Sequence, residues 1–144
     1  MIGHWLFQND MNYQKSCGAV VVDTTGEQPW YLCVLQSAGH WSLPKGRVDE
    51  DENEKVTAAR EIKKETGLDV EFMGEFRAEA RYSPKSGVMK TVVFFLAKPM
   101  GGTLAPNMDD IRACEWLTLD EAKGRLVYDD MKDILDEAEA YLRG

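Results

Sequence analysis

The sequence predicts one domain of the α/β (α+β) class, in which helices pack on a mixed β-sheet. Three observations lead to this prediction. Short runs of β-branched and aromatic residues alternate with turn-forming segments along most of the chain. Two segments, 52–66 and 128–142, instead have the end signals or the apolar stripe of helices. The 144 residues suffice for one core, and no repeat, low-complexity tract or linker interrupts them, so residues 1–144 are expected to form a single domain.

Six segments are expected to be strands, because each is short and rich in residues that favour an extended backbone. They are residues 17–22, 30–36, 41–43, 70–81, 89–97 and 113–117. The first two form a strand–turn–strand unit, and the third ends at Pro44. Loops are expected at residues 83–87 and 98–110, where Gly and Pro are frequent.

The first helix is expected to begin in a strongly acidic segment. Five of the six residues from Asp49 to Glu54 carry carboxylates, which suit the positive end of a helix dipole. Asp51 is the expected N-cap, with Glu54 completing a capping box, and Gly67 is the expected stop. The side of this helix that faces the core is expected to hold Val56, Ala59 and Ile62.

Two further helices are expected at the end of the chain. Thr118 is a good N-cap for a short helix that starts at Leu119. The final helix covers about residues 128–142, and its apolar stripe predicts that it packs on the sheet. That stripe consists of Met131, Ile134, Leu135, Ala138 and Leu142.

Charge and composition argue against several classes of function. The formal net charge of −8 disfavours non-specific binding of nucleic acid, which needs clustered Lys and Arg, but allows a phosphorylated small molecule. The three cysteines, Cys17, Cys33 and Cys114, form no CxxC pair and are expected to be reduced thiols. The N-terminal MIGHWLF lacks the features of a signal peptide, and no segment is long enough to span a membrane. A cytoplasmic protein without a membrane partner is therefore expected.

One motif between residues 46 and 68 is unusually specific. Its fixed positions hold Gly46, Glu52, Arg60, Glu61, Ile62, Glu65, Gly67 and Leu68. By chance, a pattern of this length with one mismatch should occur in about one chain in 10⁴ to 10⁵. The segment resembles the Nudix box, from which it departs at Lys64, where the first glutamate of a Glu-Glu pair belongs. The resemblance implies a Nudix α/β/α sandwich with a mixed sheet, in which the box forms a loop–helix–loop.

The spacing of Glu61 and Glu65 has a physical meaning of its own. At about 100° per residue, the two side chains lie about 40° apart on one side of a helix. Their like charges destabilise the helix slightly, and a divalent cation removes that repulsion. Carboxylate oxygens suit Mg²⁺ or Mn²⁺ and match zinc poorly. The alternative is a solvated acidic helix face without a ligand.

The resemblance implies a role for each matching residue. Glu61 is expected to bind metal or to act as the general base toward the attacking water, and Glu65 to be a principal metal ligand. The carbonyl of Lys45 is a further expected ligand. Arg60 and Glu52 are expected to form an ion pair that orients the catalytic glutamate, and a plain surface salt bridge is the alternative for this pair.

Lys64 leaves three alternatives open. Its ammonium points to solvent while the remaining ligands hold fewer metal ions, or it contacts a substrate phosphate and replaces part of a metal's charge. In the third alternative, the domain binds a ligand and hydrolyses it poorly. Each alternative alters the expected metal content, because lysine in place of glutamate changes the local charge by two units.

Segments outside the box resemble the asymmetrical diadenosine tetraphosphate hydrolases. They are KSCGAVVV at 15–22, HWSLPKGRVD at 40–49, KTVVFFLAK at 90–98, EWLTLDEA at 115–122 and the closing YDDMKDILDEAEAYL. The resemblance implies that Asp110 supplies an additional metal-binding or basic carboxylate, and that Lys45 and Lys90 lie near the phosphate chain. It also implies that Tyr82 stacks on an adenine ring and that His40 lines the pocket. The alternatives are a loop aspartate, a solvated edge lysine and a packed tyrosine.

The expected activity is hydrolysis of a phosphoanhydride bond by a metal-activated water. Dinucleoside polyphosphates are the leading nucleotide substrates, and modified nucleoside triphosphates and diphosphoinositol polyphosphates are alternatives. The last class needs a strongly basic pocket, and the loops cluster only Lys85, Lys90 and Arg81. A catalytically weak domain that senses a nucleotide is an alternative of a different class. A monomer or a homodimer is expected.

Overall fold

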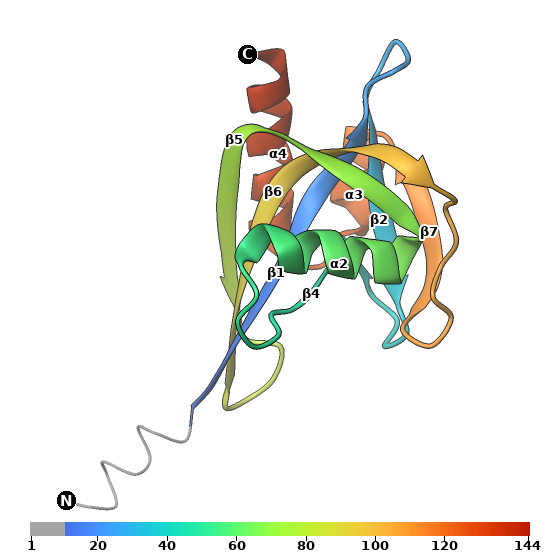
Figure 1. Cartoon of the computed structure of the whole chain (residues 1–144). Coiled ribbons are helices and arrows are strands. Elements are labelled where there is room, and N and C mark those ends of the chain that lie inside the picture. Colours follow the sequence, from blue (N-terminus) through green and yellow to red (C-terminus); the bar gives the residue numbers. More distant parts are fainter. Residues whose placement is uncertain (1–10) are drawn as a thin grey trace, which may run out of the picture.

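The computed structural model describes residues 11–144, so the expectation about the N-terminal MIGHWLF lies outside the described residues. A seven-stranded sheet and three helices make up this part of the chain (Figure 1). The strands are β1 Asn12–Asp23, β2 Trp30–Gln36, β3 Trp41–Ser42, β4 Lys45–Arg47, β5 Leu68–Tyr82, β6 Val88–Gly102 and β7 Ile111–Leu117. The helices are α2 Glu54–Thr66, α3 Leu119–Arg125 and α4 Asp129–Arg143. From residue 11 onward, no helix is both long and apolar enough to cross a membrane.

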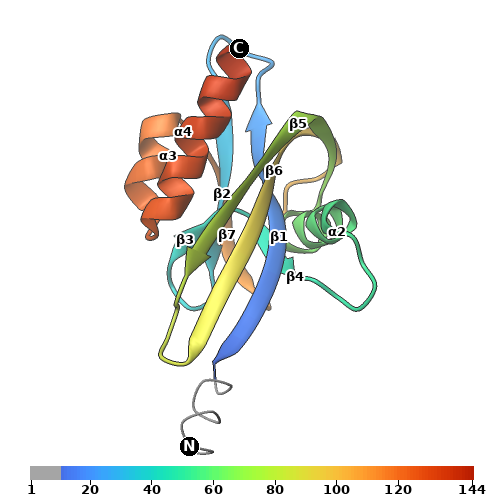
Figure 2. The same ribbon diagram turned by 90° about the vertical axis from the view of Figure 1, so that its left-hand side faces the viewer.

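The sheet is mixed, as expected. β1 and β6 run parallel, with Asn12 opposite Val88 and Val21 opposite Ala97. β2 pairs antiparallel with β1, and β5 with β6, which gives the order β3-β2-β1-β6-β5, while β4 pairs with β1 and β7 with β2. Figure 2 shows α2 on one side of this sheet and α3 and α4 on the other. The expected α/β/α sandwich is confirmed.

Both faces of the central strands are buried, which explains their unbroken apolar sequences. On β6, Phe94 packs in the cluster covered by α3 and α4, whereas the next residue, Phe95, packs in the cluster covered by α2. Leu135 of α4 belongs to the first cluster, and Ile62 of α2 belongs to the second. The core therefore holds α2, and the box with it, rigidly against one face of the sheet.

Several strands extend beyond their expected ends. β1 begins at Asn12 rather than at residue 17, and β6 continues to Gly102, which shortens the expected loop at 98–110. Pairing with neighbours explains the extra length, since Leu68 lies opposite Gly102 across the β5–β6 hairpin. The short strand β4 has no counterpart among the expected strands, and pairing with β1 creates it.

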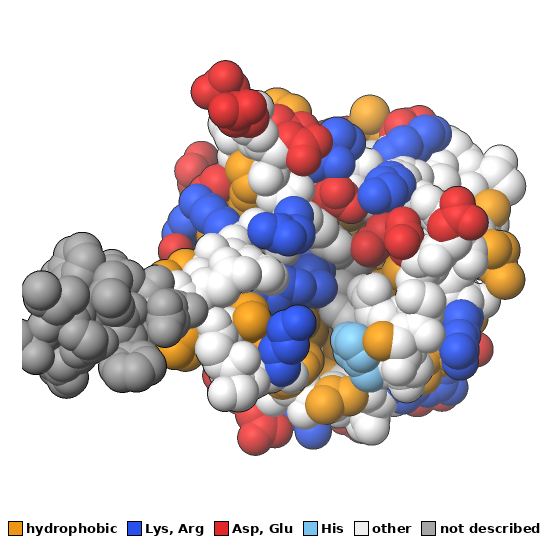
Figure 3. Space-filling view, turned by 90° about the horizontal axis from the view of Figure 1, so that it is seen from below, with side chains coloured by type: hydrophobic (Ala, Val, Ile, Leu, Met, Phe, Trp, Pro, Cys, Tyr) orange, Lys and Arg blue, Asp and Glu red, His pale blue; other side chains and the backbone are white. Residues whose placement is uncertain are grey.

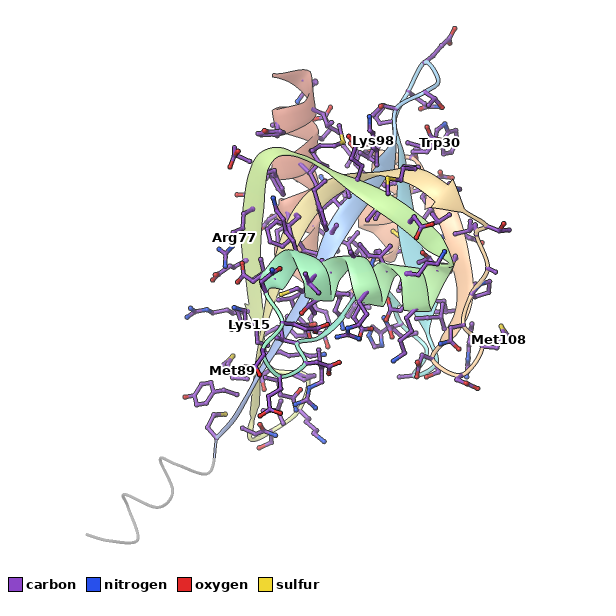
Figure 4. The ribbon with its side chains drawn as sticks, in the orientation of Figure 1. Lys15, Trp30, Arg77, Met89, Lys98 and Met108 are labelled. Atoms are coloured by element: carbon purple, nitrogen blue, oxygen red, sulfur yellow. The ribbon has the colours of Figure 1, made fainter. Side chains whose placement is uncertain are left out.

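The expected N-cap of α2 is wrong by two residues. Asn53, not Asp51, caps the helix, and its Oδ1 accepts a hydrogen bond of 2.9 Å from a backbone N–H of the first turn. Asp51 lies in the preceding loop with a φ of 65°. Glu54 is not a capping-box partner, because its carboxylate binds Lys15 of β1 at 2.7 Å and Arg77 of β5 at 2.8 Å. Figure 4 shows Lys15 and Arg77 beside the start of α2.

The face of α2 that packs on the sheet also differs from the expected face. Of the three expected core residues only Ile62 is fully buried, whereas Val56 is 50% exposed and Ala59 is partly buried. Glu61 and Glu65 share the inward side, with exposed fractions of only 7% and 6%. Contacts of α2 with β1, β4 and β5 set this rotation, which a hydrophobicity pattern does not encode.

The two C-terminal helices agree with expectation. Thr118 caps α3, and a capping box joins it to Glu121. The apolar stripe of α4 packs on the sheet, as predicted, and four of its residues are buried: Met131, Ile134, Leu135 and Ala138. Leu142 packs against the same cluster and is partly buried.

Candidate active site

Two cavities adjoin on the face of the molecule shown in Figure 3. The larger, of about 430 Å³, is named the carboxylate cavity, and its lining residues are Gln36, Ser37, Arg47, Asp49, Arg60, Glu61, Lys64, Glu65 and Asp110. The smaller, of about 190 Å³, is named the aromatic cavity, and its lining residues are Gln36, Ser37, Ala38, His40, Lys45, Tyr82, Pro84, Lys90 and Tyr128. The cavities share Gln36 and Ser37. Lys and Arg side chains gather beside the hollow in Figure 3, and His40, the one histidine of the described residues, borders it.

The structure brings all the expected site residues to these two cavities. Arg60, Glu61, Glu65 and Asp110 line the carboxylate cavity. His40, Lys45, Tyr82 and Lys90 line the aromatic cavity. The two groups come from separate parts of the chain, and the pairing of β1 with β4 and β6 brings them together.

The backbone of β4 packs directly on the two glutamates of α2. The backbone N–H of Lys45 donates a hydrogen bond of 3.2 Å to Glu65 Oε1. A Cβ atom added to Gly46 would overlap the carboxylate of Glu61, so only glycine fits at this position without a shift. The glycine of the box thus makes room for a carboxylate.

Arg60 fixes the orientation of Glu61. Its Nη1 donates to Glu61 Oε1 at 2.7 Å, its Nε donates to Glu52 Oε2 at 2.7 Å, and its Nη2 donates to the carbonyl of Arg47 at 2.9 Å. The hydrogen bond from Arg60, followed by that from the backbone N–H of Asp49, lowers the pKa of Glu52 to about 2. The expected Arg60–Glu52 ion pair is therefore present, and the same guanidinium reaches the catalytic candidate Glu61. Such an arrangement restricts Glu61 to one orientation.

Glu65 has a different electrostatic environment. Burial raises its pKa to about 7, and the charges of Glu61 and Asp110 also raise it, while Lys45 opposes the shift. Among the ion pairs formed by residues 11–144, none includes Glu65. A cation beside this carboxylate would offset the cost of its burial.

The two glutamates fit Mg²⁺ or Mn²⁺. In the described part of the chain, no group of three or more His, Cys, Asp or Glu side chains is arranged to hold a metal ion. Mg²⁺ does not need such a cage, because it commonly binds one or two carboxylates, several waters and substrate phosphates. Glu61 and Glu65 line one cavity as a buried carboxylate pair with one member unpaired, which suits that mode of binding.

Asp110 enters the same cavity but faces a cation. Its Oδ2 lies 3.7 Å from the ammonium of Lys64. The backbone holds Asp110 in place, because its N–H donates to Asn107 and its carbonyl accepts from Ser37 at 2.8 Å. The residue that departs from the box pattern thus contacts the expected additional carboxylate.

The aromatic cavity combines stacked rings with two lysines. Tyr82 stacks on Tyr128, with ring centroids 4.0 Å apart and planes inclined by 22°. Burial, followed by the charge of the neighbouring Lys90, lowers the pKa of Lys45 to about 8. The pKa of His40 is lowered by burial and then by the two lysines, which favours its neutral form. The cavity therefore offers π faces and positive charge together.

Sequence reasoning missed Gln36, Ser37 and Tyr128. Gln36 ends β2 and lines both cavities, and its buried Nε2 has no hydrogen-bond partner among residues 11–144. Tyr128 precedes α4, where the sequence offers no signal beyond an aromatic residue beside a helix. In the sequence, Gln36 is marked as a possible site residue only because it is polar and stands at the end of an expected strand, before a turn.

Comparisons with known proteins agree with this geometry. A model of the NUDIX domain family matches residues 12–138. The chain is 31% identical over 140 residues to the asymmetrical bis(5'-nucleosyl)-tetraphosphatase of Rattus norvegicus, covering 89% of this chain and 95% of that protein. It is 40% identical over 95 residues to an 8-oxo-(d)GTP phosphatase of Mycolicibacterium smegmatis, covering 66% of this chain but only 29% of that protein. The structure of a C. elegans Ap4A hydrolase in a binary complex superposes with a TM-score of 0.81 at 27% identity, covering 91% of this chain and 98% of that one.

Proposed function

This chain belongs to the Nudix hydrolase family, and we propose that it cleaves a phosphoanhydride bond of a dinucleoside polyphosphate such as diadenosine tetraphosphate, with Mg²⁺ or Mn²⁺ as cofactor. One observation carries the proposal: the carboxylate cavity adjoins a cavity with stacked tyrosines and two lysines. A dinucleoside polyphosphate has the matching parts, because an aromatic base is joined to a chain of anionic phosphates. The similarity to the tetraphosphatase of Rattus norvegicus over most of both chains supports the same substrate class.

Three side chains of the carboxylate cavity have tasks in this proposal. Glu65 and Glu61 hold the divalent ion, with the carbonyl of Lys45 as a further ligand. When bound, the ion supplies positive charge to the phosphate oxygens and lowers the pKa of water. Arg60 holds Glu61 in the orientation needed to accept a proton from the attacking water. Because the site is preformed, the chain does not have to reorganise when charge develops on the phosphate.

The aromatic cavity binds the rest of the substrate. Lys45 and Lys90 contact phosphates of the chain, and the lowered pKa of Lys45 rises again when an anion binds beside it. A nucleobase stacks on the exposed side of the Tyr82–Tyr128 pair. Gln36 lies at the junction of the cavities, where its carboxamide can donate a hydrogen bond to a bridging phosphate.

A second candidate is hydrolysis of a modified nucleoside triphosphate. The 40% identity with the 8-oxo-(d)GTP phosphatase of Mycolicibacterium smegmatis favours it. That substrate has one base and a shorter phosphate chain, so it needs the same carboxylate cavity and a single base contact.

A product assay tests the proposal. The protein is incubated in the presence of Mg²⁺ with one compound at a time: diadenosine tetraphosphate, 8-oxo-dGTP, ATP or a diphosphoinositol polyphosphate. The products of each reaction are resolved by chromatography. Formation of ATP plus AMP from diadenosine tetraphosphate at the highest kcat/KM supports the leading substrate. A higher kcat/KM for 8-oxo-dGTP replaces it with the second candidate, and binding without turnover of any compound indicates a nucleotide sensor.

Tyr82→Ala is expected to raise the KM for diadenosine tetraphosphate by roughly 10- to 100-fold with a smaller change in kcat, because base–aromatic stacking contributes about 1–3 kcal/mol. Tyr82→Phe keeps the stacking ring and should stay close to the wild type. Tyr13→Ala is the matched control, since Tyr13 is a tyrosine of β1 with 75% exposure. A KM for Tyr82→Ala equal to that of the control would exclude Tyr82 from the base site.

A further inference from the structure

The carboxylate cavity contains an internal ion pair between Lys64 and Asp110. The ammonium of Lys64 comes from α2 and lies 3.7 Å from Asp110 Oδ2, which comes from the segment before β7. Both side chains are about half exposed, at 51% and 52%, and both line the cavity that contains Glu61 and Glu65. The pair is therefore accessible from the same space as the expected metal site.

The charges that line this cavity nearly cancel. Its carboxylates belong to Asp49, Glu61, Glu65 and Asp110, and its cations to Arg47, Arg60 and Lys64. Arg60 pairs with Glu61 and Asp49, and Lys64 pairs with Asp110. Among the described residues that line the cavity, Glu65 is the carboxylate left without an ion pair. The unpaired carboxylate of Glu65 therefore attracts one divalent cation, whereas the other carboxylates are already neutralised by Arg60 and Lys64 and attract a second cation only weakly.

A second divalent cation would have to bind at Asp110. It would then meet the ammonium of Lys64 at the distance of an ion pair, where like charges repel strongly in a partly buried site. Lys64 thus occupies the place in which a second metal ion would neutralise Asp110.

We propose that Lys64 acts as a built-in counter-cation, which limits the nucleotide-free cavity to one divalent ion and supplies the second positive charge to the bound phosphate chain itself. The proposal rests on the proposed function for its phosphate contact, but not for its metal count. The side chain of Lys64 is half exposed, and its ammonium lies at the end of a flexible aliphatic chain. The ammonium can therefore turn from Asp110 to a phosphate oxygen without rearrangement of α2.

Counting bound Mn²⁺ without nucleotide tests the metal part. Free Mn²⁺ is followed by electron paramagnetic resonance during titration of the wild type, Lys64→Glu, Lys64→Gln and the control Lys63→Gln. Lys63 is the matched control, because it is a neighbouring lysine of α2 with 52% exposure that pairs with Asp69 outside the cavity. We expect one Mn²⁺ per chain for the wild type and Lys63→Gln, and two for Lys64→Glu, which replaces the cation beside Asp110 with a carboxylate. The double variant Lys64→Glu/Asp110→Asn should bind one again.

Lys64→Gln tests the phosphate part. Its KM for diadenosine tetraphosphate should rise about tenfold, the effect of losing one hydrogen bond to a charged group, while Lys63→Gln keeps the wild-type KM. Two Mn²⁺ ions on the wild type, no Mn²⁺ at all, or an unchanged count for Lys64→Glu would each overturn the proposal. If the protein binds one Mn²⁺ as expected but does not cleave the nucleotide, the proposed function fails and the metal count stands.

Discussion

Replacement of Glu65 by glutamine is expected to stabilise the metal-free protein above pH 7 and, in the same variant, to lower kcat by roughly 10³-fold. The loss of activity follows from the loss of a metal ligand, because metal charge contributes several kcal/mol to stabilisation of the transition state. The gain in stability follows from burial, since an ionised Glu65 is costly in the absence of a cation. Opposite changes in stability and activity are typical of a functional group kept in an unfavourable environment.

The pH dependence of this gain has a defined sign. In the unfolded chain Glu65 loses its proton near the ordinary value of 4.5, whereas in the folded protein its pKa is raised to about 7. Between these values the unfolded state binds fewer protons, so wild-type stability falls as pH rises, and it stays lower above pH 7. Glutamine does not titrate. The difference in Tm between Glu65→Gln and the wild type should therefore be small at pH 4 and grow up to about pH 7.

The measurement is thermal unfolding in EDTA at a series of pH values, together with kcat in saturating Mg²⁺. Glu71→Gln is the control, because Glu71 is an exposed glutamate of β5 outside both cavities. Mg²⁺ should raise the Tm of the wild type and of Glu71→Gln more than that of Glu65→Gln. A Glu65→Gln variant that retains most of its turnover would show that this carboxylate is not a metal ligand in catalysis.

Gly46→Ala is expected to lower kcat by about 10²-fold with only a small change in Tm. The added Cβ would overlap the carboxylate of Glu61. The end of that side chain can move aside, so the backbone of β4 stays in place. A displacement of a catalytic group by about 1 Å is enough for a rate loss of this size. The predicted damage therefore lies in the position of Glu61, not in the fold.

Gly26→Ala is the matched control for this prediction, because its added Cβ has no neighbour within 4 Å. Gly18→Ala gives a contrasting result, since its Cβ would meet the backbone of Pro44 and Lys45, which cannot move cheaply, and its Tm should fall. Kinetics and thermal unfolding of the three variants separate the two effects. Wild-type kcat for Gly46→Ala would contradict the prediction that Glu61 needs its present position.

Much of the fold could be predicted from the sequence, because local signals agreed with the tertiary packing. β2 and the stripe of α4 match their expected residues, and Thr118 caps α3 as expected. One error, the N-cap of α2, occurs where two local choices are nearly equal. Asp51 and Asn53 can both cap a helix. In the structure Asn53 is the N-cap, and it directly follows Glu52, whose carboxylate is bound by Arg60 of the helix.

The candidate site was predictable to the extent that one helix carries it. The spacing of Glu61 and Glu65 places two carboxylates on one side of α2 wherever that helix packs. Contacts between distant segments were not predictable in the same way. The stacking of Tyr82 on Tyr128 and the place of Gln36 between two cavities depend on how β2, β5 and the start of α4 meet.

The sequence by itself determined the family, the sandwich of helices on a mixed sheet, and the two glutamates of the box, because the motif and the order of strands and helices can be read along the chain. Only the tertiary structure decided that both glutamates are buried, that Gly46 makes room for one of them, and that Lys64 pairs with Asp110. The physical reason is that burial and ion pairing are properties of groups brought together from different segments. A pattern along one segment specifies which groups are available, and the packing of the sheet specifies which of them meet.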